Sequence, residues 1–366
     1  MEKFAFAIHP LDTKDVTRKY PFARWLPDRI VEAAITLLPP LEASHITGVE
    51  SPHAKVEGWF IGVPLTSRQM MQLPEHKVLK KIIGGGRIAE RLGAKIYGLG
   101  AFTSVVGDAG VTVAKNLNIA VTTGNSYTVA TALEGTKEAA KLMGIDIAEA
   151  QVAVVGATGA VGRVSSIILA RDVKNLTIVG RDEGKLQQLR DEILKETGLV
   201  AQYSRDVSSI LPDMDIIVAV SSAVGSIIRP QHLKPGAVVC DVARPRDVSR
   251  QVAEERDDVL VIEGGAVMVP GRDPNFNINF GFPPRTSYAC MAETMMLAME
   301  GRFESFTLGR NLSVPQVDEI SRIARKHNFR LAGFRSFERA VDRQDIENIR
   351  QNAVARRGAR TVAVTM

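Results

Sequence analysis

Short apolar runs alternate with longer amphipathic stretches between residues 151 and 264 of the chain. The apolar runs are rich in Val, Ile and Leu, and they fall at residues 152–155, 176–179, 215–220, 237–240 and 259–262. Strand-length runs separated by helix-length stretches form the βαβ pattern of a parallel sheet. The pattern therefore predicts an α/β protein with a doubly wound parallel sheet of the Rossmann type.

The residues before this region mix strand and helix signals in a less regular order. Strands are expected at residues 4–8, 55–63, 94–99 and 118–122, and helices at residues 28–38 and 128–143. A helical pattern over residues 67–92 contains Gly84, Gly85 and Gly86, which together would cost a continuous helix roughly 3 kcal/mol relative to alanine. We therefore expect a kink or two separate helices at these glycines. Helices at about 287–300, 314–327 and 337–352 end the chain.

The sequence QVAVVGATGAVGR, residues 151–163, combines a strand, a glycine turn and a helix start. Gly156 allows the turn, Gly159 lets the backbone approach a pyrophosphate, and Gly162 lets the helix pack close to the strand. The free N–H groups of the first helical turn would face the phosphates. The alternative is a purely structural βα turn. The residues expected to contact a dinucleotide here are Gly156, Thr158, Gly159, Ala160, Val161 and Gly162.

The end of the second expected strand indicates which dinucleotide binds. An acidic residue at this point would bind the ribose of NAD, whereas an arginine would accept the 2′-phosphate of NADP. Arg181 follows the strand and Lys185 lies one helical turn later, which favours NADPH. Asp182 leaves an alternative open, because it could cap the next helix or bind the ribose. By topology alone, Ser221, Ser222, Gly264 and Gly265 are expected near the ribose and the nicotinamide.

Two loops in the first part of the chain place small polar residues directly after expected strands. In open α/β sheets ligands bind beyond the carboxyl ends of strands, so these loops are candidates for substrate contact. Such residues also cap helices, and that alternative stays open. The candidates are Phe102, Thr103 and Ser104 in the first loop, and Gly124, Asn125 and Tyr127 in the second. We thus expect an N-terminal α/β substrate-binding domain (residues 1–145), an NADP-binding Rossmann domain (146–284) and a C-terminal helical segment (285–366).

The two cysteines occupy different kinds of sequence. Cys240 lies inside an apolar strand and is expected in the core, whereas Cys290 lies near the start of the helix SYACMAETMMLAMEG. Ser287 could cap that helix and place Cys290 at its third position, where the helix dipole lowers the pKa of a thiol. A small buried residue is the alternative. A nucleophilic thiol beside a nicotinamide would accept an acyl group from a thioester, and hydride transfer would then release an aldehyde.

Composition narrows the classes of function. The net charge is +5, aromatic residues make up 5% of the chain, and no basic run is interleaved with aromatic residues, so nucleic-acid binding is not expected. We expect no metal site. No apolar run approaches the roughly 20 residues that span a bilayer, and the first residues lack the apolar core of a signal peptide. We therefore expect a cytoplasmic enzyme; the oligomeric state stays open.

With these features assembled, the chain resembles the cyanobacterial long-chain acyl-ACP reductases, which form fatty aldehydes. The resemblance extends from the N-terminal strand to about Phe329. It implies NADPH as cofactor, an acyl-enzyme on Cys290, and acyl-ACP or acyl-CoA as substrate. The segments that carry it are GLGAFTS at 98–104, TTGNSYT at 122–128, VVGATGAVG at 154–162, ACMAE at 289–293 and LGRN at 308–311.

The glycines at 84–86, the loop at 269–284 and the basic tail depart from that family, which leaves the acyl length and the carrier open. Residues 239–248 also resemble a piece of glutamyl-tRNA reductase, although the N-terminal nucleophile motif of that family is missing. The competing interpretations are a shikimate-dehydrogenase-like oxidoreductase acting on a small alcohol or amino acid, and a non-catalytic NADP-binding regulator. The loop TTGNSYT contains no acid for a proton-transfer pair with lysine, which counts against the oxidoreductase on a small alcohol.

Overall fold

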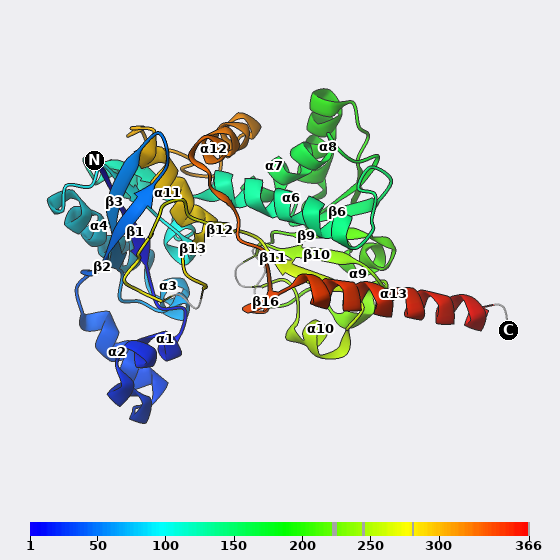
Figure 1. The fold of residues 1–366 in the computed structure, drawn as a ribbon, viewed down its shortest axis with the longest axis horizontal. Coiled ribbons are helices and arrows are strands. Elements are labelled where there is room, and N and C mark those ends of the chain that lie inside the picture. Colours follow the sequence, from blue (N-terminus) through cyan, green and yellow to red (C-terminus); the bar gives the residue numbers. More distant parts are fainter. Residues whose placement is uncertain (222–224, 244–245, 280–281, 365–366) are drawn as a thin grey trace. The chain divides into compact units, whose positions relative to one another are not determined.

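The computed structural model describes residues 1–221, 225–243, 246–279 and 282–364, and its contacts divide the chain into two compact units (Figure 1). Unit 1 contains Met1–Tyr127, Val267–Asn311 and Glu319–Arg330; unit 2 contains Thr128–Ala266, Leu312–Asp318 and the rest of the chain from Leu331. Each unit is therefore assembled from separate stretches of sequence. The domain boundaries predicted at residues 145 and 284 stay predictions.

Unit 1 is built on a five-stranded sheet of order β2-β3-β1-β4-β5. Strands β1, β3, β4 and β5 are parallel, and β2 pairs with β3 as an antiparallel edge strand that the sequence pattern did not reveal. The strands are β1 (Glu2–Ile8), β2 (Leu41–Glu50), β3 (Lys55–Gly62), β4 (Ile96–Gly98) and β5 (Ala120–Thr122). The two loops expected to contact substrate follow β4 and β5, so they share one edge of this sheet.

Helices cover both faces of this sheet. Odd-numbered strand residues such as Ile61 and Tyr97 face α4, while Phe6 and Gly98 face α11, because side chains alternate along a strand. The helices of this part of the chain are α1 (Thr13–Lys19), α2 (Asp28–Leu37), α3 (Ser67–Gln72), α4 (Glu75–Arg91), α5 (Val111–Lys115), α11 (Ala289–Met299) and α12 (Val314–His327), with 3-10 turns at Pro21–Trp25 and Ala101–Ser104.

The three consecutive glycines do not interrupt α4, so the predicted kink at residues 84–86 is wrong. The helix runs unbroken through them, and the actual break lies between α3 and α4, before Pro74. A Cβ at Gly85 would lie 2.7 Å from the Tyr97 hydroxyl, and one at Gly86 would lie 2.3 Å from Leu117. The packing gained by this close approach offsets the poor helix propensity of glycine.

Unit 2 carries a six-stranded parallel sheet of order β11-β10-β9-β6-β7-β8. Counted from β6, the order reads 3-2-1-4-5-6, which is the Rossmann order. The predicted fold class is therefore confirmed, although β8 was not predicted. The strands are β6 (Gln151–Val155), β7 (Asn175–Val179), β8 (Gln202–Ser204), β9 (Ile216–Ala219), β10 (Val238–Asp241) and β11 (Leu260–Glu263).

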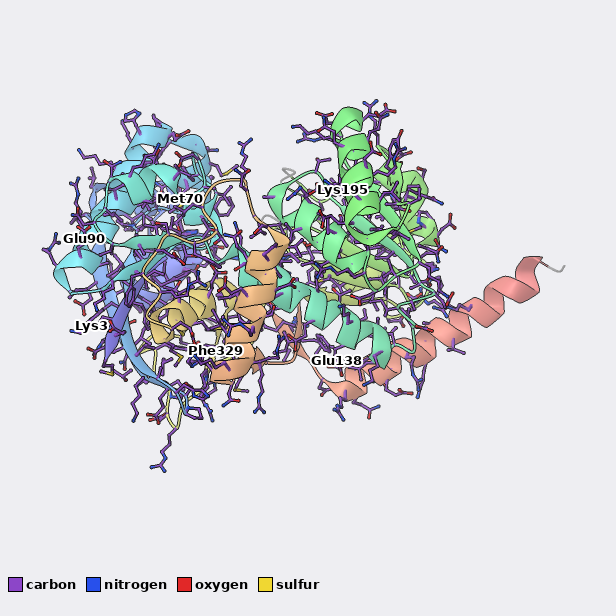
Figure 2. All side chains as sticks on the ribbon, turned by 90° about the horizontal axis from the view of Figure 1, so that it is seen from above. Lys3, Met70, Glu90, Glu138, Lys195 and Phe329 are labelled. Atoms are coloured by element: carbon purple, nitrogen blue, oxygen red, sulfur yellow. The ribbon has the colours of Figure 1, made fainter. Side chains whose placement is uncertain are left out.

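Two hydrophobic clusters hold the helices of unit 2 against its sheet. Val152 and Val154 belong to one cluster and Ala153 and Val155 to the other, so β6 is buried on both faces. Lys195 and Glu138 are exposed on the outer sides of their helices (Figure 2). The helices are α6 (Asn125–Leu142), whose first three residues belong to unit 1, α7 (Ala160–Leu169), α8 (Glu183–Thr197), α9 (Val207–Ile210), α10 (Arg250–Glu255) and α13 (Arg343–Val364).

Short strands complete the fold. β12 (Ala266–Met268) lies between β13 (Thr286–Tyr288) and β14 (Arg330–Leu331), and β15 (Phe334–Ser336) pairs with β16 (Arg339–Val341). The last helix begins at Arg343, six residues after the start predicted for it. None of the helices in the described ranges is long and apolar enough to cross a membrane.

Candidate functional site

Cys290 is the second residue of α11, the helix that follows β13 directly. The predicted cap is wrong, because Ser287 lies within β13 and its hydroxyl donates to the Tyr288 carbonyl at 3.3 Å. Tyr288 occupies the cap position and makes no capping bond with its side chain. The thiol nevertheless lies in the first turn, where backbone N–H groups have no partner within the helix.

Both candidate substrate loops lie directly against Cys290. A Cβ placed on Gly124 would be 2.2 Å from the Cβ of Cys290, and one on Gly100 would be 3.1 Å from its Sγ. Gly124 also has a φ of +75°, a conformation that strains any residue with a side chain. The structure thus brings together the loops after β4 and β5 and the first turn of α11, all within unit 1.

Glu293, one helical turn after Cys290, is fully buried and joins these segments. Its Oε2 accepts hydrogen bonds from the Ser126 hydroxyl at 2.6 Å and the Tyr127 N–H at 2.9 Å. Its Oε1 accepts from the hydroxyls of Thr122 and Thr307, the latter at 3.1 Å. Burial raises the pKa of Glu293, and the four hydrogen bonds act in the opposite direction. This carboxylate fixes the loop after β5 against α11.

Sequence reasoning did not assign a role to Glu293, although a signal was present. It is the one charged residue in the stretch from Ala289 to Met299, in which every other residue except Thr294 is apolar. A buried carboxylate is costly unless it is hydrogen-bonded, so such a residue indicates a polar partner within the core.

The predicted effect of the helix dipole on the Cys290 thiol is also wrong. Burial raises the pKa of Cys290 to about 12, the charge of Glu293 adds to the rise, and the backbone N–H groups of Cys290 and Met291 offset only part of it. The residue as a whole keeps an intermediate exposure. Burial raises the pKa of the thiol more than the helix dipole lowers it, because the free energy of desolvating a thiolate exceeds the stabilisation that one helix end provides.

The remaining substrate candidates differ in what their side chains do. Thr103 and Ser104 are buried and donate to loop carbonyls, at Gly100 and Ala101 respectively, so these hydroxyls shape the first loop. Phe102 is also buried and its ring meets His9 edge-on, with centroids 6.0 Å apart. In the second loop α6 begins at Asn125, three residues earlier than predicted, so Asn125 and Tyr127 lie in its first turn.

The glycine turn in unit 2 has the geometry that the sequence motif requires. Gly156 has a φ of +84°, and a Cβ there would lie 2.7 Å from the Cα of Ser221. A Cβ at Gly162 would lie 2.3 Å from the Gly156 carbonyl, whereas one at Gly159 would meet nothing closer than 3.5 Å. Gly156 and Gly162 are therefore required by packing within the chain. Gly159 is not, which leaves its exposed side for a ligand.

The helix after this turn begins at Ala160, with Gly159 as its cap and no side-chain capping bond. Thr158 borders Gly180 at the end of β7, while Ala160 and Val161 form the first turn of α7. The N–H groups of that turn have no partner within the helix. The residues present therefore fit a dinucleotide phosphate.

The end of β7 shows what the Asp182 side chain does within the chain; whether it also binds a ribose stays open. Asp182 caps α8, because its side chain accepts a hydrogen bond from the Lys185 N–H at 3.1 Å. Arg181 and Lys185 are exposed beside it. Lys185 forms an ion pair with the Asp182 carboxylate at 3.9 Å, so Arg181 is the exposed basic side chain beside the strand end with no described ion pair.

A pair of buried aspartates organises the neighbouring strand ends. Asp247 accepts from the Ser221 N–H at 2.9 Å and from its hydroxyl. Asp241, at the end of β10, accepts from the N–H groups of Ala243 and Val248. Burial raises the pKa of Asp247, and the Ser221 bonds act in the opposite direction. The sequence signal for these residues was the segment 239–248, which sequence reasoning noted only as a resemblance.

The remaining described residues that were predicted to contact the cofactor lie in a loop of unit 2, and the other cysteine lies in its core. Ser222 lies outside the described residues. Gly264 follows β11, with Ala132 and Val242 3.1 Å from where its Cβ would be, and Gly265 has a φ of +91°. Cys240 is fully buried in the core, as predicted. Among the described residues no cluster of side chains could hold a metal ion.

Comparison with known proteins gives relatives for both halves of the chain. Residues 137–263 match the family of shikimate / quinate 5-dehydrogenases. The chain is 32% identical over 327 residues to the aminotransferase PigE of Serratia sp., covering 86% of this chain and 37% of PigE. It is 28% identical over 312 residues to a long-chain acyl-[acyl-carrier-protein] reductase of Synechococcus elongatus, covering 80% of this chain and 87% of the reductase.

Among solved structures, the nucleotide-binding domain of glutamyl-tRNA reductase from Thermoplasma volcanium aligns with a TM-score of 0.26 and 14% identity, over 38% of this chain and 86% of that one. The chain spans little more than a third of PigE, so the name of that protein does not say what the shared part does. The sequence matches thus show similarity to a reductase and, over residues 137–263, to the shikimate dehydrogenase family.

Proposed function

We propose that the chain is an NADPH-dependent reductase that converts a fatty acyl thioester to a fatty aldehyde through an acyl-enzyme on Cys290. The observation that carries the proposal is the position of this cysteine. It lies in the first turn of α11, with two glycine loops against it and a buried carboxylate one turn behind it. The similarity to an acyl-ACP reductase includes this region and supports the assignment.

The acyl transfer exchanges one thioester for another. The sulfur of Cys290 bonds to the acyl carbon, the bond to the carrier sulfur breaks, and the thiol proton passes to the departing carrier thiolate. Because burial raises the pKa of Cys290, the resting thiol is protonated at neutral pH. The attack therefore depends on a bound substrate to displace solvent and receive that proton, which protects the thiol from reacting with other electrophiles.

The first turn of α11 provides the groups that stabilise charge during this exchange. The N–H groups of Cys290 and Met291 already interact with the sulfur. Donors without helical partners can also stabilise the oxyanion that develops on the acyl carbonyl. Gly100 and Gly124 lack side chains where a Cβ would press on the cysteine, so the backbone of both loops stays close to the acyl group.

The residues of unit 2 that would bind NADPH lie at the ends of its strands. Gly156, Gly159 and Gly162 would hold the pyrophosphate, and Arg181 and Lys185 would hold the 2′-phosphate. Ser221 and the turn at Gly264 and Gly265 would border the ribose and the nicotinamide. NADPH, when bound, would supply the hydride that releases the acyl group as an aldehyde. The thiolate of Cys290 then takes up a proton and the thiol is restored.

The match to an aminotransferase is compatible with this reaction. It covers only 37% of that protein, and aldehydes are the class of compound that amino-group transfer consumes. The proposed substrates are acyl-ACP and acyl-CoA, and the acyl length is open.

The competing oxidoreductase on a small alcohol has one finding in its favour, the family match over residues 137–263. That match covers the nucleotide-binding region, which both activities need. A shikimate-dehydrogenase-like site would also need a lysine paired with an acid. The described partners of the buried Glu293 are three hydroxyls and one backbone N–H instead.

The test is to mix the purified protein with NADPH and a series of acyl-ACP and acyl-CoA thioesters, and to measure aldehyde and intact protein mass. Without NADPH we expect one acyl adduct, which Cys290→Ala abolishes. Cys240→Ala is the matched control and should keep the adduct, because Cys240 is fully buried in the core of unit 2. An adduct that survives Cys290→Ala, or no adduct with any thioester, would overturn the mechanism.

A further inference from the structure

A basic hollow lies in unit 1 at the edge of the sheet where β2 turns into β3. Its volume is about 620 Å³, within the range of small-molecule sites, and all its lining residues belong to unit 1. The charged side chains that line it are Glu50, Lys55, Arg272, Arg285 and Arg330.

The hollow has an excess of positive charge that the chain does not neutralise. Glu50 is the one carboxylate among the lining residues; it pairs with Lys55 at 2.6 Å and also interacts electrostatically with Arg272, so four cationic side chains share one negative charge. Throughout the described ranges, Arg272, Arg285 and Arg330 have no carboxylate within ion-pair distance. Arg285 donates to the Gly271 carbonyl at 2.8 Å, which holds its guanidinium at the wall of the hollow. Arginine groups arranged in this way favour an anion with several oxygen atoms, such as a phosphate.

The hollow and the thiol are joined by a short, fixed piece of chain. Arg285 directly precedes β13, and β13 leads into Cys290 at the start of α11 (Figure 1). Cys290 lies five residues after Arg285, so their Cα atoms are at most about 18 Å apart. In a phosphopantetheine arm, the number of bonds between the phosphate and the sulfur is about that in the backbone of four to five residues. The extended arm is therefore about 14 to 16 Å long. It is thus about as long as the greatest separation that the chain allows between Arg285 and Cys290.

We propose that this hollow binds the phosphate end of the phosphopantetheine arm while the thioester at the other end reaches Cys290. The proposal rests on the proposed function, and it adds a subsite that recognises the carrier rather than the acyl chain. Acyl-CoA and acyl carrier protein share this phosphate. Acyl-pantetheine has the same thioester and lacks it, so the contribution of the hollow can be separated from the chemistry at the thiol.

The experiment compares the wild type with Arg272→Gln/Arg330→Gln, which removes two exposed charges and no described hydrogen bond. The matched control is Arg87→Gln/Arg91→Gln, which removes two exposed arginines of α4 in the same unit, neither of which lines the hollow. Aldehyde formation is measured with acyl-CoA, acyl-ACP and acyl-pantetheine of one acyl length. Binding of CoA alone is measured by calorimetry, without turnover.

We expect the ratio of kcat/KM for acyl-CoA or acyl-ACP to that for acyl-pantetheine to fall about ten-fold or more in the hollow variant, and to stay within about two-fold in the control. An effect on CoA alone would identify the nucleotide carrier, and one on acyl-ACP alone the protein carrier; both support the subsite. An unchanged ratio, or an equal fall in the control, overturns it. If no thioester is reduced, the proposed function fails, and the CoA titration then decides separately, because unaltered binding in the hollow variant refutes the subsite.

Discussion

Glu293 offers the most direct test of how the thiol site is held together. Replacing it with alanine removes the acceptor of four hydrogen bonds in a fully buried place. A hydrogen bond to a charged group contributes about 1.5 to 3 kcal/mol, but the hydroxyls of Thr122 and Thr307 are 3.2 Å apart and can bond to each other instead. We therefore count two of the four as lost. Glu293→Ala should lower the free energy of unfolding by about 3 to 5 kcal/mol.

Glu293→Gln separates charge from shape, because its amide keeps the volume and one acceptor oxygen. We expect a loss of about 1 to 2 kcal/mol, since the threonine hydroxyls can rotate to accept from the amide. The loss should depend on pH. Burial raises the pKa of Glu293, so the stability this group contributes is fully present below its unfolded pKa and declines as the pH rises through the folded one. The difference in the free energy of unfolding between the wild type and Glu293→Gln should therefore be larger at pH 5 than at pH 8.

The assay is urea unfolding followed by tryptophan fluorescence. Both tryptophans, Trp25 and Trp59, belong to unit 1, and Trp59 is buried in its core, so the signal reports the unit that contains the site. Glu42→Ala is the control, because Glu42 is an exposed glutamate of the same unit and should change stability by no more than about 0.5 kcal/mol. If Glu293→Ala and Glu42→Ala unfold at the same urea concentration, the carboxylate does not hold the loops and our account of the site is wrong.

Three further predictions concern single positions. Gly124→Ala should cost at least about 2 kcal/mol more than Gly93→Ala in the same urea assay, because both positions have positive φ but only Gly124 presses on Cys290; equal losses would contradict the contact. Alkylation of Cys290 by iodoacetamide should keep rising about ten-fold per pH unit beyond pH 9, as a pKa of about 12 requires, and a plateau near pH 9 would show an ordinary thiol. Arg181→Ser should lower kcat/KM for NADPH about ten-fold or more and leave that for NADH nearly unchanged; a wild type that uses NADH equally well would refute the NADP assignment.

The parts of the fold that follow from local pattern were predictable. The strands of the Rossmann sheet are continuous apolar runs, and the glycine turn needs residues whose conformation only glycine adopts easily, so both are evident in the sequence. The edge strand β2 and the short β8 were missed because partly exposed strands have a weaker pattern. At Gly84, Gly85 and Gly86 the propensity argument failed because neighbours distant in sequence fill the space beside the helix.

The site itself was predictable only in its location. The two loops and Cys290 were identified from their residue types, and the structure brings Gly100, Gly124 and Cys290 together. The pKa of the thiol is raised, whereas a lowered pKa was predicted, because burial cannot be judged from a helix position alone. Glu293 could not be given its role in advance because its partners at 122–127 lie some 170 residues earlier in the chain.

The division of unit 1 into separate stretches has a consequence for synthesis. Its first 127 residues leave the ribosome well before Val267–Asn311, which supply the helix that covers one face of its sheet. At about 5 to 20 residues per second, the intervening stretch Thr128–Ala266 takes about 7 to 28 seconds to make, and that stretch is most of the Rossmann unit. Most of the Rossmann unit can thus be made while the sheet of unit 1 still has an uncovered apolar face. Nascent chains halted near residue 265 should therefore bind chaperones through their N-terminal third, and this binding should end once α11 has emerged.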